Sequence, residues 1–389
     1  MRWMSVCLLL SCIPLCPPAR GQEDAPPLTI PPVVETDVTV PERDRFAFRA
    51  EYLYWYLQEL AVPPVLTTGP AGSSAALGEP GTQVLRGGTR IESRHDRYIG
   101  VRARGDWWLG EERDVALQFD AFFLERDSTH FTVRPGQVPV LAIPYFDAET
   151  GQSRSFVIAG FNPERGEVSG GSRLYTRMEL FGQEGNALFN LGRDESRELN
   201  LIVGTRFLQL RERLDLTSAS ASVPDGGATV FGIEDHIQTF DKFYGAQAGL
   251  LGTWRRGRWF LEGKAAVALG ANEQLIRSKG VRIRHSPLER IEEPYGLFVL
   301  PSNRGAFDRW SFDAVTDLRI NLGFNLRDWA TLLVGYSLLT WSGPVRPGDQ
   351  VQPVNLGQLT GAGAALPQPN FHEDFFYAQG LSVGMSFQW

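Results

Sequence analysis

Ten segments of this sequence alternate apolar and polar residues with a period of two, and most of them run to ten residues or more. They lie at residues 46–56, 97–105, 114–126, 172–181, 198–211, 240–254, 258–269, 309–324, 329–341 and 380–389. A period of two predicts β-strands that each have one apolar face. The chain is therefore expected to be an all-β protein with about ten long strands.

The connections between these segments alternate in length, with every long one on the same side. Short connections cover 105–110, 255–257 and 325–328, and a moderate one covers 182–197. Long connections cover 58–96, 127–171, 212–239, 270–308 and 342–374. Outer-membrane barrels join antiparallel strands by short periplasmic turns and longer external loops. The pattern predicts a single antiparallel transmembrane barrel of about ten strands, with both termini in the periplasm.

A charged face on each segment fits either a soluble sandwich or a membrane barrel, and the two differ in what that face contacts. In a sandwich the charges meet water, whereas in a barrel they line the lumen and the apolar face meets lipid. Closing the sheet into a ring removes the unpaired edges that hydrocarbon does not tolerate. Twelve strands remain an alternative, because 129–134, 153–159 or 280–285 could each contribute to an additional hairpin.

The first 21 residues have the layout of a cleaved signal peptide. Arg2 precedes a short apolar core, and Ala19 and Gly21 are small residues before a cut at Gln22. A lipoprotein cut before Cys12 is the alternative. Residues 22–44 are rich in proline and acids and are expected to form a periplasmic linker. The barrel is then expected over residues 45–389.

Composition excludes several classes of function. All three cysteines lie inside the predicted signal peptide, so the mature chain would lack thiolate catalysis and cysteine-bound zinc. The net charge of −7 disfavours nucleic-acid binding. No cofactor is expected. The expected partners are outer-membrane lipid, the barrel-assembly machinery and small polar solutes.

Several stretches resemble a known family. They include Phe181-Gly-Gln-Glu-Gly-Asn, Val203-Gly-Thr-Arg-Phe, Phe243-Tyr-Gly-Ala-Gln and Pro344-Val-Arg-Pro-Gly-Asp-Gln, which occur in this order. Together they are similar to the bacterial outer-membrane family called putative beta-barrel porin-7. One departure is Asp241-Lys242 before Phe-Tyr-Gly, where the resemblance leads us to expect asparagine. The resemblance implies an outer-membrane barrel but no particular activity.

The polar faces of the segments supply the candidate lumen-facing residues. These are Arg49, Glu51, Arg102, Arg104, Gln118, Asp120, Arg177, Glu179, Arg206, Gln247, Glu262, Lys264, Asp317 and Arg319. They could form a salt-bridged, nearly closed interior, or they could line a narrow path for small polar solutes. Ten strands is only slightly above the size at which side chains fill a barrel, which favours the closed or narrow interior.

An outer-membrane hydrolase and a loop-based surface receptor are the alternative functions. A hydrolase would need an acid–histidine pair, and acids flank His236 and His372 in the predicted external loops. Ordinary polar loop composition explains the same residues, so no catalytic or metal-binding residue is assigned. A receptor would use the long loops to bind a ligand.

The chain ends on Phe387 and Trp389, which share the apolar face of the closing segment. Aromatic residues are favoured at the membrane–water interface. A last strand that ends in an aromatic residue also resembles the signal read by barrel-insertion machinery, so these two residues are the predicted assembly signal.

Overall fold

The structure is a computed structural model that describes residues 44–389 apart from 89, 92–96, 126 and 223–228. The predicted signal peptide and almost all of the predicted linker lie outside these residues. The described chain is composed of strands and two short 3-10 helices. In chain order these elements are β1 (Phe46–Leu57), β2 (Leu60–Ala61), β3 (Leu66–Gly69), β4 (Gln83–Arg86), β5 (Arg90–Ile91), β6 (Tyr98–Leu109), β7 (Val115–Leu124), β8 (Asp127–Val133), β9 (Val140–Asp147), β10 (Gln152–Asn162), β11 (Gly166–Arg193), β12 (Arg197–Ser222), β13 (Thr229–Arg256), β14 (Trp259–His285), β15 (Arg290–Glu293), β16 (Gly305–Arg327), β17 (Ala330–Trp341), η1 (Pro347–Gln350), η2 (Leu356–Thr360) and β18 (Phe376–Gln388).

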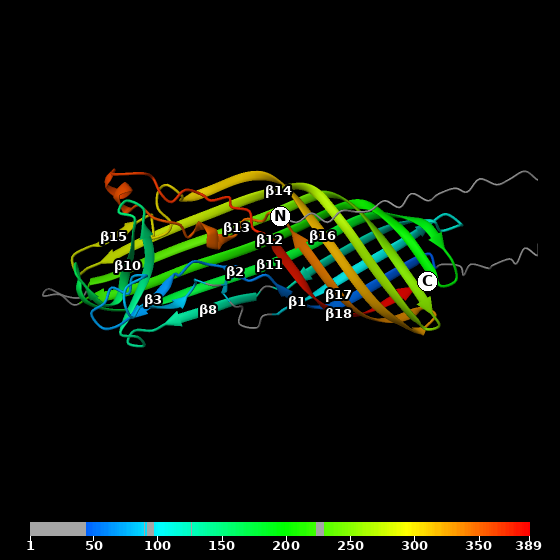
Figure 1. Ribbon diagram of the computed structural model, residues 1–389, viewed down its shortest axis with the longest axis horizontal. Coiled ribbons are helices and arrows are strands. Elements are labelled where there is room, and N and C mark those ends of the chain that lie inside the picture. Colours follow the sequence, from blue (N-terminus) through cyan, green and yellow to red (C-terminus); the bar gives the residue numbers. More distant parts are fainter. Residues whose placement is uncertain (1–43, 89, 92–96, 126, 223–228) are drawn as a thin grey trace, which may run out of the picture. The chain divides into compact units, whose positions relative to one another are not determined.

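A ring of about ten antiparallel strands forms a closed barrel (Figure 1). Its order is β1, β6, β7, β11, β12, β13, β14, β16, β17 and β18. The ring closes where β18 pairs with β1, with Phe387 opposite Phe48. The all-β antiparallel barrel expected from the sequence is confirmed. Within the described residues no helix is long and apolar enough to cross a membrane.

The two ends of the ring differ in their connections. At one end, here called the turn end, β6–β7, β11–β12, β13–β14 and β16–β17 are joined by two to five residues. The beginning of β1 and the end of β18 also lie there, since Phe46 and Trp389 exchange backbone hydrogen bonds of 3.0 Å. The opposite end, here called the loop end, has the long connections. This arrangement follows the alternation of connection lengths in the sequence.

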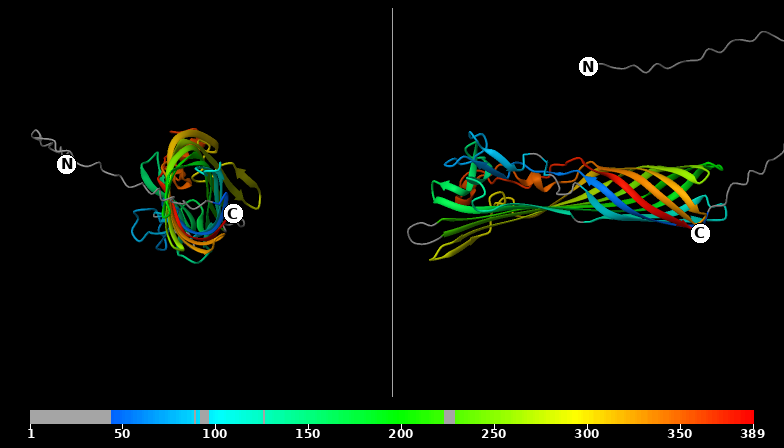
Figure 2. Two further views of the ribbon diagram at one scale, coloured as in Figure 1. Left: turned by 90° about the vertical axis from the view of Figure 1, so that its right-hand side faces the viewer. Right: turned by 90° about the horizontal axis from the view of Figure 1, so that it is seen from below.

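Four neighbouring strands are much longer than the sequence pattern indicated. β11, β12, β13 and β14 have 28, 26, 28 and 27 residues and continue beyond the ring at the loop end (Figure 2). The prediction of long loops at 127–171, 212–239 and 270–308 is therefore wrong for much of each range. Likewise, β8 pairs with β11 and 280–285 is the end of β14, so neither adds a hairpin to the ring. The 152–162 strand pairs with β9 and with the beginning of β11, also outside the ring.

A second layer covers one face of this extension. β10 pairs with the beginning of β11, and the sheet continues through β9 and β3 to β4. A hydrophobic core lies beneath it. Its members come from the extension, from this layer and from the connections around residues 297–300 and 351–354, and include Leu66, Leu141, Ile143, Ile158, Leu174, Leu214, Leu216, Ile233, Ile237, Phe298 and Val354. The loop end is therefore a packed domain rather than a set of separate loops.

The outer face of the ring has an apolar belt between two groups of aromatic residues. Near the turn end, Phe46 stacks on Trp107 and on Trp389. Toward the loop end, Phe207 contacts Phe181 and Tyr244 on the neighbouring strands. Tyr244 and Trp254 lie ten residues apart on β13, which is ~33 Å along a strand and about 25 Å along the axis at a tilt of ~40°. That height matches the hydrocarbon layer of an outer membrane.

Both faces of the long strands change polarity at one level. On β12 the outward face is apolar at Leu199, Val203 and Phe207 but polar at Arg211 and Arg213. The inward face changes in the opposite sense, from polar Asn200 and Arg206 to the buried Leu208, Leu210, Leu214 and Leu216, with Glu212 as a buried exception. Below this level the outside meets lipid. Above it the outside meets water and the inside is the core of the packed domain. The outward residues there are therefore polar and most inward residues are apolar, the reverse of the arrangement below.

Candidate functional site: the charged lumen and its cap

A balanced cluster of four cations and four carboxylates fills the middle of the ring. Its members are Arg102, Arg206, Lys264 and Arg319 together with Glu51, Asp120, Glu184 and Asp317, and no more than 5 % of each side chain is exposed. They come from seven different strands. Such burial costs several kcal/mol for each isolated ion, so the cluster is stable only because its members pair with one another.

Glu184 and Asp317 are the two central acceptors of this cluster. Lys264 Nζ lies 2.5 Å from a Glu184 oxygen and 3.0 Å from an Asp317 oxygen. Arg206 also binds both carboxylates, with 2.6 Å to Asp317. Arg319 donates to Glu184 at 2.8 Å and to Asp120 at 2.5 Å. The shared partners join opposite walls of the ring, so the cluster closes the lumen instead of lining it.

Further inward charges lie nearer the turn end. Glu262 accepts from Arg49 at 2.7 Å and from Arg104 at 3.3 Å, and Asn321 also donates to it. Beyond them a cavity of about 300 Å³ opens at the turn end, lined by Arg49, Arg104, Asp106, Glu198, Arg255 and Glu262 among others. The cavity reaches inward as far as Arg49, Arg104 and Glu262.

The amides complete the interior. Gln118 donates to Asp106 at 2.8 Å and accepts from Asn186 at 3.2 Å, and Gln247 donates to Glu184 at 2.8 Å. Twelve of the fourteen predicted lumen residues are thus part of one connected interior. The sequence reasoning missed Glu184 and Asn186, because Gly182-Gln-Glu-Gly-Asn186 has the composition of a turn. Their signal was the alternation itself, which continues through Leu188 with the same parity.

The facing of Arg177 and Glu179 is opposite to the prediction. They pair with each other on the outer face of β11, which they share with Phe181. Leu174, Met178 and Leu180, predicted to meet lipid, are buried inside. The error arose because residues 172–181 belong largely to the extension above the membrane belt. There, the outside is in water and the inside is a hydrophobic core.

The connection after β17 folds back over the central cluster and caps it at the loop end. The Arg346 side chain is 1 % exposed and pairs with Glu212 of β12. Val345 N–H donates to Asp241 at 3.0 Å, and Gln274 donates to the carbonyl of Gly343 at 2.7 Å. A Cβ at Gly348 would overlap the Ala61 carbonyl oxygen, so this close approach requires glycine. Residues 343–350 are here called the cap.

A polar layer connects the cap to the wall below it. Asn272 donates to Asp313 at 2.9 Å and to Asp241 at 3.3 Å, and Trp341 Nε1 donates to Asp313 at 2.7 Å. On the solvent side of the cap, burial and the nearby carboxylate of Asp374 raise the pKa of Asp349 to about 6. Asp241, the residue at which the sequence departs from the expected asparagine, therefore has a structural role. Its side chain accepts a hydrogen bond from the backbone of the cap.

The histidines show no catalytic arrangement in the part of the chain that is described. His236 lies on the outer face of the extension, with Nδ1 2.9 Å from Asp215 and Nε2 3.2 Å from Glu234. The backbone N–H of His372 donates to Asn370, while neighbouring Glu373 pairs with Arg309. No group of metal-ligating side chains occurs among the described residues.

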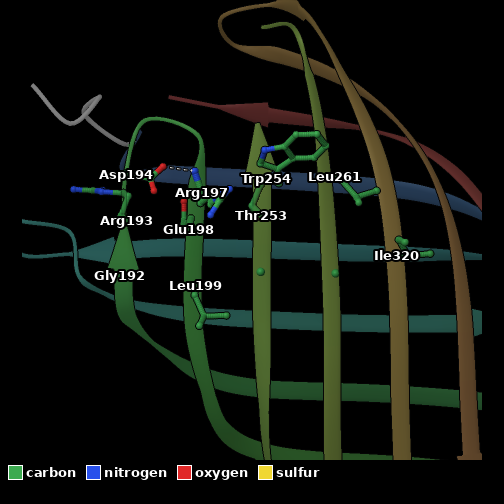
Figure 3. A pocket seen from close by; sticks show the side chains of 12 residues that line it. Gly192, Arg193, Asp194, Arg197, Glu198, Leu199, Thr253, Trp254, Leu261 and Ile320 are labelled. Carbon is green, nitrogen blue, oxygen red and sulfur yellow. Dashed lines mark hydrogen bonds between the residues drawn. The ribbon is translucent and has the colours of Figure 1, made fainter. Parts of the chain in front are cut away.

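A hollow of about 570 Å³ lies on the outer face of the ring rather than in the lumen (Figure 3). Leu199, Trp254, Leu261 and Ile320 of the apolar belt line one part of it, and the β11–β12 turn residues Arg193, Asp194 and Arg197 line another. Gly252 and Gly263, which are direct cross-strand partners, leave its floor without side chains. Its position assigns it to the lipid-facing surface.

Comparison with known proteins identifies a family. The family model described as putative beta barrel porin-7 matches residues 48–389.

The chain belongs to this family.

Membership in the putative beta barrel porin-7 family agrees with the ring, the apolar belt and the outer-membrane location predicted from the sequence. The family description gives an architecture and does not assign a solute or a reaction. The search of curated proteins gave no match.

Similarity to solved structures is low in both sequence and TM-score. The outer membrane protease OmpT from Escherichia coli is 11 % identical, with a TM-score of 0.35, 90 % of this chain covered and 100 % of that chain. The toluene transporter TodX from Pseudomonas putida is 8 % identical, with a TM-score of 0.22 and coverage of 90 % and 91 %. A FadL homologue from Pseudomonas aeruginosa is 8 % identical, with a TM-score of 0.23 and coverage of 88 % and 90 %.

Proposed function

We propose that this porin-7 family member is a closed outer-membrane barrel that anchors a rigid, folded sheet domain at the cell surface. The observation that carries the proposal is the central cluster of four cations and four carboxylates, whose shared partners join opposite walls of the ring. The cap adds a second closure above it through Arg346 and Glu212. In this role the protein is structural and has no enzymatic activity.

The orientation in the membrane follows from the same proposal. Short turns of outer-membrane barrels face the periplasm, so the turn end and both termini are periplasmic and the packed domain is outside. Residues 1–21 would be removed as a signal peptide, and residues 22–44 would link the barrel to the periplasm. The barrel-assembly machinery would read Phe387 and Trp389.

A narrow path for small polar solutes is the second candidate function. The cavity of about 300 Å³ at the turn end favours it, because Arg49, Arg104 and Glu262 give that cavity a polar wall. Passage would require both the cap and the central cluster to rearrange. The conductance of the resting protein therefore distinguishes the two candidates.

Single-protein recording in planar bilayers tests the proposal. We expect folded wild-type protein to be silent, and we expect it to remain silent when residues 343–350 are replaced by a Gly-Ser linker, since the central cluster still fills the ring. Removing both closures, by adding Asp120→Ala, Glu184→Ala, Arg206→Ala, Lys264→Ala, Asp317→Ala and Arg319→Ala, should produce discrete conductance steps. Discrete steps from the wild type would contradict the closed barrel and support the solute path.

The hydrolase alternative is tested separately with peptide and lipid substrates. The proposal expects no turnover by folded wild-type protein. Turnover that His236→Ala or His372→Ala abolishes would contradict it.

A further inference from the structure

Four outward-facing arginines cluster on β11–β14 directly above the outer aromatic residues of the belt. Arg177 is the cross-strand partner of Arg213, Arg213 is opposite Gln238, and Gln238 is opposite Arg277. The next row toward the membrane contains Glu179, Arg211, Phe240 and Leu275 in the same order of strands. Both rows lie on the water side of the level at which the strands change polarity.

The cluster has more cations than its nearest carboxylates balance. Arg177 and Arg211 share Glu179, with 3.6 Å from Arg211 to the carboxylate, and Arg213 binds Asp215 at 2.6 Å. Like charges directly opposite on neighbouring strands destabilise a sheet, yet Arg177 and Arg213 are so placed. The Nε of Arg211 is buried without a hydrogen-bond acceptor in the described structure. These features indicate a missing anionic partner.

Aromatic rings hold the guanidinium groups in position. The guanidinium carbons of Arg211 and Arg277 lie 5.0 Å and 5.2 Å from the centre of the Phe240 ring, and that of Arg213 lies 5.9 Å from the centre of Tyr175. A hollow of about 120 Å³ is lined by Arg177, Arg211, Arg213, Gln238 and Phe240, along with Glu212. A guanidinium fixed in this way presents its N–H groups as a fork that matches phosphate oxygens.

The height of the hollow identifies the source of such a phosphate. Phe240 is four residues beyond Tyr244 on β13, which is ~13 Å along the strand and about 10 Å along the axis at a tilt of ~40°. Tyrosine at this position marks the membrane interface, so the hollow lies at the depth of the lipid headgroups of the outer leaflet. One row closer to the membrane, Lys242 is already paired with Glu273 at 2.9 Å.

We propose that Arg177, Arg211 and Arg213 of the hollow, together with Arg277 over the neighbouring Phe240 ring, bind a phosphate group carried by the headgroup of an outer-leaflet lipid. The phosphate fills the hollow against Phe240 and balances the opposed Arg177 and Arg213. The lipid chains then lie along the apolar belt below Phe207 and Tyr244. This site is on the outer wall and is separate from the lumen and its cap.

Native mass spectrometry of the purified full-length barrel in detergent tests the assignment. The probes are a bis-phosphorylated, acylated glucosamine disaccharide, the same lipid without phosphates, phosphatidylglycerol and inorganic phosphate. We expect the phosphorylated glycolipid to bind at least tenfold more weakly to Arg211→Gln/Arg213→Gln. Arg284→Gln/Arg290→Gln removes the same charge from the far tip of the extension and should change binding less than twofold.

The remaining arms separate the possible sources of the phosphate. Equal binding of the dephosphorylated lipid, or equal binding by the Arg211→Gln/Arg213→Gln variant, would overturn the proposal. Complete displacement by millimolar inorganic phosphate, without preference for either phosphorylated lipid, would overturn the assignment to a lipid. If the double variant does not run as a compact, heat-modifiable barrel, the single variant Arg277→Gln replaces it, with at least a threefold loss of binding expected and no loss counting against the site.

Discussion

Arg346 in the cap donates a hydrogen bond of 2.8 Å from Nη2 to Glu212 of β12, and its Nε binds the other carboxylate oxygen. The two residues are 134 positions apart in the chain, and the side chain of each is 1 % exposed. The guanidinium also reaches the carbonyl of Gln58 at 3.3 Å. The pair therefore fixes the connection after β17 onto the wall of the barrel and onto the connection after β1.

Substituting Arg346 with alanine should release the cap. The carboxylate of Glu212 would remain buried without its partner, and breaking one half of a buried ion pair typically costs about 3–5 kcal/mol. We expect the midpoint of unfolding in guanidinium chloride to fall, and we expect hydrogen exchange of residues 343–350 to accelerate. The double variant Arg346→Met/Glu212→Leu removes both charges and should recover most of the stability. A double variant no more stable than Arg346→Ala would contradict the pairing.

Substituting Glu184 with alanine should destabilise the barrel strongly, because Arg206, Lys264 and Arg319 would lose a shared carboxylate. We expect a loss of about 3–5 kcal/mol, measured by denaturant titration of the folded, heat-modifiable form in micelles. Glu179→Ala is the matched control on the same strand. Glu179 forms partly exposed ion pairs on the outer face, which contribute only about 0–1 kcal/mol. Equal losses in the two variants would contradict the opposite facing of these residues.

The region around the cap should become more stable as the pH falls from neutral. The pKa of Asp349 is raised to about 6 by burial and by Asp374, so the folded state favours the protonated acid. This contribution is fully present below the ordinary pKa of an aspartate and is lost as the pH rises through about 6. The protection factors of residues 347–360, which correct for the intrinsic pH dependence of amide exchange, should therefore rise between pH 7 and pH 5. Asp349→Asn should remove most of this dependence, and an unchanged dependence in that variant would assign the effect to another group.

Deleting Trp389 should impair assembly of the barrel in cells. Its backbone exchanges two hydrogen bonds with Phe46, and its ring stacks on the same residue at the closure of the ring. We expect a large reduction of heat-modifiable protein in the outer-membrane fraction, measured by seminative electrophoresis. Trp389→Phe keeps an aromatic terminus and should assemble normally. Normal amounts of the protein that lacks Trp389 would contradict the assignment of Trp389 to the assembly signal.

The prediction for β11 shows how far local pattern reasoning extends. The stretch from Gly182 to Asn186 contains two glycines and three polar residues, which is typical of a turn, yet it is a strand whose inward side chains are Glu184 and Asn186. The polar residues are suited to a strand here because they meet charges from β12, β14 and β16. Those partners are distant in sequence, so the local composition could not identify them.

The sequence by itself determined the antiparallel ring, its closure by the last strand and the inward position of residues such as Glu51, Asp120, Lys264 and Arg319. It did so because a period of two fixes which residues share a face. Only the tertiary structure decided what each face meets. Along one strand, Arg206 points into a charged lumen while Leu214 points into a hydrophobic core, and Phe207 meets lipid while Arg213 meets water. That change depends on where the membrane ends and where the cap and the second layer pack, and these are contacts between residues far apart in the chain.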